Sequence, residues 1–156
     1  MADGLSGAHR GQINWRVVEE VELQAPKEGD QLFVNYFRDF SNMDLKAIVS
    51  YIHLPSTFIV PQEIVVFSSA SEVEGFWRPR FEDLKKQEFG HTERAEANIK
   101  VLNYNTALAS SKAIRYTKDG AELEQRRATF ALRKAEHGWK IVTLIHHSPD
   151  NVINMK

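Results

Sequence analysis

The segment TALASSKAIRYTKDGAELEQRRATFALRKAEHGWKIVTLIHHS, from Thr106 to Ser148, decides the fold. It contains three long runs rich in apolar and β-branched residues, separated by KDGA and EHG. Asp-Gly and His-Gly pairs between such runs are typical of hairpin turns. The segment therefore predicts three consecutive antiparallel strands, at Thr106–Lys118, Ala121–Ala135 and Trp139–His147.

Upstream of this segment the periodicity changes from strand to helix. A further strand is expected at His91–Asn103, and a strand pair around Pro61 in STFIVPQEIVVFSS. Apolar residues at helical spacing predict helices over Gln31–Ser41, Asn42–Ile52 and Ser71–Gln87, the last opened by a Ser71-x-x-Glu74 capping box. Helices first and a meander of strands last indicate an α+β domain whose helices cover one face of the sheet.

The N-terminal region carries no comparable pattern. Residues 1–13 contain Gly, Ala and Ser without a period, and INWRVVEEVEL reads either as a short strand or as a helical turn. The following QAPKEGD is expected to end that element. These features predict an N-terminal arm over residues 1–30 and one domain over residues 31–153.

Composition excludes several classes of function. The formal net charge is -1 and there is no cysteine, so neither a nucleic-acid surface, nor a disulfide, nor a thiolate metal site is expected. No apolar run reaches the length of a membrane span, and the first residues do not resemble a secretory signal. A cytoplasmic protein without a membrane partner is the expectation. Phosphate-loop and dinucleotide motifs are also missing, so no cofactor is expected.

The order of elements resembles the SnoaL-like group of the NTF2-like superfamily. The resemblance rests on YFRDFSNMDLKAIVSYI and on the strands from Thr106 to Ser148, including the Asp-Gly turn and the closing strand that starts with Gly-Trp-Lys-Ile. It implies a strongly curved, mainly antiparallel sheet that forms a cone, with three helices packed on its concave side. It also implies an apolar chamber inside the cone.

The ketosteroid isomerases of the same superfamily suggest which residues to inspect. Tyr36 stands at the position of their tyrosine, eight residues before Asp44-Leu45. Their aspartate base is replaced by Val60, before Pro61, and their second acid is replaced by Phe130. Because neither side chain can move a proton or donate to an oxyanion, steroid-isomerase chemistry is not expected here.

Strand parity assigns the remaining candidates. Successive side chains point to opposite faces, so His146 and His147 cannot ligate one metal from a shared face. In the resembled family the residue before the closing serine lines the cone, which implies an inward His147. For strand 106–118 two choices stay open, with either Leu108, Ser110, Lys112, Ile114 and Tyr116 or Ala109, Ser111, Ala113 and Arg115 facing inward.

The sequence thus predicts an apolar pocket for a small cyclic or aromatic molecule, of a few hundred Å³. Tyr36 and His147 are its catalytic candidates, the phenol as a donor and the neutral imidazole as a base. The chain is expected to act as a binding protein or as a cofactor-free lyase, isomerase or hydrolase. The alternative is a non-catalytic homodimerisation or partner-binding module, and a homodimer through the outer sheet face is expected. The expected pocket residues are Tyr36, Phe58, Val60, Trp77, Phe130, Leu132, Thr143, Ile145 and His147.

Overall fold

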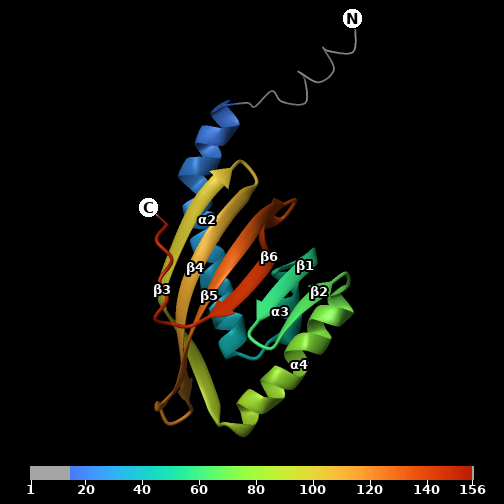
Figure 1. The fold of residues 1–156 in the computed structure, drawn as a ribbon, viewed down its shortest axis with the longest axis vertical. Helices are drawn as coiled ribbons and strands as arrows, with labels where there is room; N and C mark the ends of the chain where they lie inside the picture. Colours follow the sequence, from blue (N-terminus) through green and yellow to red (C-terminus); the bar gives the residue numbers. More distant parts are fainter. Residues whose placement is uncertain (1–14, 156) are drawn as a thin grey trace, which may run out of the picture.

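The computed structural model describes residues 15–155, with side chains from Lys27 onward. Over this range the chain forms an α+β fold of three helices and one six-stranded sheet (Figure 1). The elements in chain order are α2 (Trp15–Ser41), α3 (Leu45–Ser50), β1 (Ile52–Val60), β2 (Glu63–Phe67), α4 (Ala70–Lys86), β3 (Phe89–Asn103), β4 (Thr106–Thr117), β5 (Glu122–Ala135) and β6 (Gly138–His147).

The sheet has the strand order β2-β1-β6-β5-β4-β3. All neighbouring strands are antiparallel except β1 and β6, which are parallel. The long hairpins β3–β4, β4–β5 and β5–β6 form the meander that the turn residues predict, so the mainly antiparallel sheet is confirmed.

The helices cover one face of this sheet, called the inner face here. In Figure 1, α2 runs along β3 to β6, and α4 lies at the end of the sheet near β1 and β2. Aromatic side chains fill the space between the layers, because α2 and α4 both present them to the strands. Phe33, Phe58 and Trp77 are almost fully buried in this core.

The first helix is longer than the sequence pattern suggests. A helix beginning at Gln31 is wrong, because α2 continues without interruption from Trp15 through Pro26 and Gly29. Gly29 serves a packing purpose rather than ending the helix. A Cβ at this position would lie 2.8 Å from Cδ1 of Ile99, so glycine lets α2 approach β3 closely. The expectation for residues 1–14 falls outside the described range.

Side-chain caps fix the starts of the two shorter helices. Asp44 accepts a hydrogen bond from the Ala47 amide at 3.0 Å and begins α3. Ser69 accepts from the Glu72 amide at 3.3 Å while Glu72 accepts from the Ser68 amide at 3.1 Å. The capping residue of α4 is therefore Ser69 and not Ser71. Among the helices of the described residues, none has the length and apolar character needed to cross a membrane.

Candidate functional site

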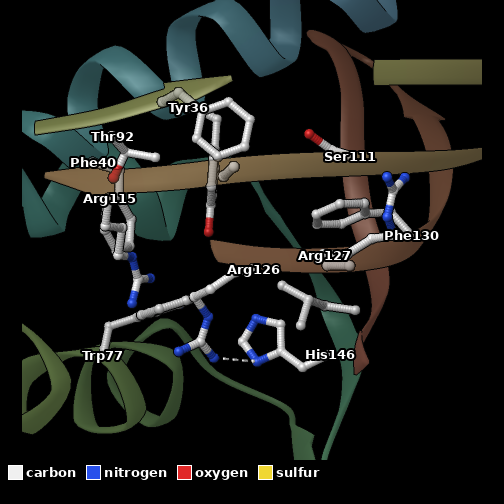
Figure 2. A pocket seen from close by; sticks show the side chains of 14 residues that line it. Tyr36, Phe40, Trp77, Thr92, Ser111, Arg115, Arg126, Arg127, Phe130 and His146 are labelled. Carbon is white, nitrogen blue, oxygen red and sulfur yellow. Dashed lines mark hydrogen bonds between the residues drawn. The ribbon is translucent and has the colours of Figure 1, made fainter. Parts of the chain in front are cut away.

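A small chamber lies inside the cone, between α2, α4 and the inner face of β3 to β6 (Figure 2). Its volume is about 40 Å³, enough for a few water-sized groups but not for a ring. Two clefts at the mouth, of about 220 Å³ and 440 Å³, share Arg126 and His146 with the chamber. The closed space is thus much smaller than the few hundred Å³ expected, because aromatic side chains fill the cone.

Aromatic rings from α2 and α4 form the wall of the chamber. The Phe40 ring packs edge-on against Trp77, with ring centroids 5.7 Å apart, and Tyr36 lies 6.1 Å from Phe40. On the sheet side, Phe130 and Leu144 are neighbours in the β5–β6 ladder. The wall of the chamber is therefore mainly apolar and aromatic.

Tyr36 contributes a hydroxyl group to this apolar wall. Figure 2 shows its side chain extending from α2 so that the hydroxyl points toward Arg126 and His146. Burial raises the pKa of Tyr36, and the nearby charges of Arg115 and Arg126 offset only part of this effect. The phenol therefore keeps its proton at neutral pH and can donate a hydrogen bond into the chamber.

Four arginines line the two clefts at the mouth, and three of them lie near Glu124 and His146. Arg115 donates to Glu124 Oε1 at 2.5 Å, and Arg126 Nη1 lies 3.4 Å from both oxygens of the same carboxylate. The third, Arg80, comes from α4 and faces the same two clefts. Burial opposes ionisation of Glu124, but Arg115 and Arg126 hold its pKa below the usual range. Glu124 is thus a paired carboxylate and a poor base.

His146 lies at the centre of this cluster. Arg126 Nη2 is 3.0 Å from His146 Nδ1, and because arginine can only donate, Nδ1 accepts and the imidazole proton is on Nε2. Burial, followed by the charges of Arg126 and Arg115, lowers the pKa of His146 to about 3. At neutral pH His146 is a neutral hydrogen-bond donor and not a general base.

Two further polar groups in the chamber wall have no hydrogen-bond partner in the protein. They are Trp77 Nε1 and Thr92 Oγ1, on residues that are 2% and 8% exposed. A buried polar group without a partner costs about 1–3 kcal/mol. Both residues line the chamber, although the two atoms themselves are almost fully shielded from solvent.

The structure brings together three of the residues predicted for the pocket. Tyr36, Trp77 and Phe130 line the chamber. Phe58, Val60 and Leu132 are buried in the core outside it, with Val60 also in the wall of the larger mouth cleft. Of the two choices left open for strand 106–118, the structure selects the inward set of Ala109, Ser111, Ala113 and Arg115.

The inward orientation predicted for Thr143, Ile145 and His147 is wrong. Ile145 pairs with Thr129 on the outer face, where His147 Nε2 lies 2.8 Å from Thr129 Oγ1. The cause is a β-bulge in β6: the ladder pairs Leu132 with Ile141 and Ala131 with Thr143, so Val142 is the extra residue. One such residue flips every following side chain to the other face.

The same bulge explains why sequence reasoning missed His146. If β5 and β6 paired residue for residue from their turn, without a bulge, His147 would lie opposite Arg126 on the inner face. With the bulge, His146 pairs with Ala128 and reaches the chamber. Arg115 stands in one of the two sets left open for strand 106–118, and Arg126 is not among the expected pocket residues. Residues 27–155, whose side chains the structure describes, include no group of three His, Asp or Glu side chains placed to hold a metal ion.

Comparison with known proteins agrees with this architecture. The model of a family described as NTF2-like protein (DUF6841) matches residues 27–149. No curated protein matches the chain.

Two solved structures illustrate the likeness in three dimensions. An NTF2-like protein with a cystatin-like fold from Novosphingobium aromaticivorans is 13% identical, with a TM-score of 0.69 over 83% of this chain and 85% of that chain. An NTF2-like protein of unknown function from Pseudomonas putida is 18% identical, with a TM-score of 0.65 over 86% of this chain and 93% of that chain. At these identities the likeness shows the fold, and it confirms the one expected from the sequence.

Proposed function

The chain belongs to the DUF6841 family of NTF2-like proteins, and we propose that it binds a small cyclic or aromatic molecule at the mouth of its cone. The ring lies in the cleft of about 220 Å³ beside Phe40, Trp77 and Leu84, and a polar group enters the chamber of about 40 Å³. Tyr36 and Trp77 are the principal contacts. Phe130, deeper in the same wall, limits how far the polar group can enter.

The observation that carries this proposal is the pair of unpartnered groups in the chamber wall, Trp77 Nε1 and Thr92 Oγ1. In a module that served only for assembly, the interior would be filled by apolar side chains and would not retain this cost. A ligand atom that hydrogen-bonds these groups recovers the free energy that their burial costs.

Binding is favoured over acid–base catalysis because no proton acceptor near neutral pKa faces the chamber among the described residues. Val60 and Phe130 are apolar, the pKa of His146 is lowered to about 3, and Glu124 is ion-paired with a lowered pKa. A lyase or isomerase reaction at this site would need the substrate to supply its own base.

Filling the chamber is expected to abolish this binding. Ala128 lines the chamber and pairs with His146 and Ser111, so Ala128→Leu places three extra carbons inside. The affinity for benzyl alcohol, measured by NMR titration of the indole N–H signals, should fall by about tenfold or more. Ala121→Leu, at an exposed turn position, is the control and should bind as the native chain does. Native-like binding by Ala128→Leu would refute the proposed location.

A second candidate property, self-association, has its own supporting observation on the outer face of the sheet. On this face, two rows of side chains run across β2, β1, β6, β5 and β4. Neither row contains a charged residue. Ile64 and Val66, on the edge strand β2, are 69% and 62% exposed. We call this surface the outer belt, and it consists of Thr57, Ile59, Ile64, Val66, Leu108, Thr129, Ala131, Thr143 and Ile145, whereas Ser110 of the same rows is fully buried.

We propose that the outer belt pairs with the same belt of a second copy, since a broad uncharged sheet face is typical of a self-complementary interface. Ile145→Lys puts a charge at the centre of the belt and should shift sedimentation from dimer to monomer at micromolar concentration. Leu102→Lys changes an exposed apolar residue on β3, outside the belt, and should leave the sedimentation as in the native chain. A native chain that sediments as a monomer at high micromolar concentration would remove this proposal.

A further inference from the structure

The chamber and its mouth contain several groups that can only donate hydrogen bonds, beside hydroxyl groups that can donate or accept. Arg115 and Arg126 can only donate, and His146 presents its Nε2–H because Nδ1 already accepts from Arg126. The indole Nε1–H of Trp77 can also only donate. The complementary ligand group must therefore accept several hydrogen bonds from nearly one direction.

The donors are only partly satisfied by the protein. A guanidinium has about five N–H donors, whereas the hydrogen bonds of Arg115 go to Glu124 alone among the described residues. Arg126 divides its two terminal nitrogens between Glu124 and His146. Arg80 donates Nη1 to the Phe76 carbonyl at 2.8 Å and lies 3.7 Å from Glu63. Donor capacity thus remains on the side facing the clefts.

Charge at the site favours the same kind of ligand. Arg115 and Arg126 share one carboxylate, that of Glu124, which is itself part-exposed at the mouth. The Arg115 guanidinium also lies over the Phe40 ring, 4.8 Å from its centroid, which holds it close to the proposed ring site. The aromatic cleft is lined by three cations, Arg80, Arg115 and Arg126, and by two carboxylates, Asp83 and Glu124, which leaves a net positive charge.

We propose that the ligand is a cyclic or aromatic monocarboxylate, whose carboxylate accepts hydrogen bonds from Arg115, Arg126 and Nε2 of His146 while its ring packs beside Phe40 and Trp77. This inference rests on the proposed binding function and names its ligand class. A planar carboxylate matches the fork of a guanidinium and is small enough for a chamber of about 40 Å³. A neutral imidazole, fixed with its proton on Nε2, completes the donor set without adding charge.

The test compares two probes of similar shape, benzoate and benzyl alcohol, by NMR titration of the native chain at neutral pH. Benzoate should bind about tenfold or more tightly than benzyl alcohol and should move the indole N–H signal of Trp77. High salt should reduce this difference. Arg126→Gln should remove the preference for benzoate, because it weakens benzoate binding far more than benzyl alcohol binding, and Arg115→Gln should act in the same direction. Arg133→Gln, on the outer side of the same strand, should keep the preference.

The outcomes separate this inference from the proposed function. If both probes bind equally and move the Trp77 signal, the binding function stands and the carboxylate preference is refuted. If neither probe binds, the binding function fails and the inference fails with it. A preference for benzoate that persists in both Arg126→Gln and Arg115→Gln would refute the assigned contacts. Thermal unfolding of each variant shows that it is folded, and Arg126→Lys, which retains the charge, should restore part of the preference.

Discussion

Phe58→Ala is expected to lower the free energy of unfolding by about 3–5 kcal/mol, a large share of the stability of a domain of this size. Phe58 is fully buried and packs edge-on against Phe67 and Phe76, with ring centroids 5.1 Å and 5.3 Å away. It also meets Trp77 at 6.1 Å, so one ring links β1, β2 and α4. Removing it leaves a cavity that these three packed elements cannot close. Urea denaturation monitored by circular dichroism measures the change.

Two control variants make this expectation specific. Phe58→Leu keeps most of the apolar volume and should cost clearly less than Phe58→Ala. Tyr104→Ala removes an aromatic ring that is 49% exposed in the β3–β4 turn and should change stability by no more than about 0.5 kcal/mol. A loss below about 1 kcal/mol for Phe58→Ala would contradict the packing of α4 on β1 and β2.

Local sequence signals were sufficient for most of the fold. The Asp-Gly and His-Gly turns determine where β4, β5 and β6 begin and end, and these positions differ little from the expected strands. The start of α2 was missed because Pro26 and Gly29 are helix breakers in isolation. Tertiary contact overrides that preference at Gly29, which packs against Ile99 of β3, far away in the sequence.

The candidate site was only partly predictable, because it depends on sheet register. Tyr36 and Phe130 could be found from the positions that the family resemblance gives them, and Trp77 from helical spacing. His146 could not be found in this way, because the bulge at Val142 turns the following side chains of β6 to the opposite face. The inward orientation of Arg115 stayed open in the sequence and Arg126 carried no signal, because pairing with Glu124 and His146, which lets both guanidinium groups lie at the inner face, is visible only in the structure.

The second large effect concerns pH, and it reverses the roles that the sequence suggested for the two histidines. In the folded chain the pKa of His146 is about 3, chiefly through burial and then through Arg126, Arg115 and Arg80. In the unfolded chain an ordinary histidine titrates near pH 6.5. Between these values the unfolded state binds one proton more than the folded state, so acidification favours unfolding.

We therefore expect the free energy of unfolding to have its full value above about pH 6.5. At lower pH it should decrease by up to about 1.4 kcal/mol for each pH unit. His146→Gln should flatten this dependence between about pH 6.5 and pH 5, whereas His147→Gln, on the outer face, should leave it as in the native chain. Asp39 and Glu124 have lowered pKa values too, but they lose their contribution only below the ordinary carboxylate range near pH 4. Urea denaturation at a series of pH values gives the slopes. Equal slopes for the two variants would mean that His146 is solvated in the folded state and that the arginine cluster does not enclose it.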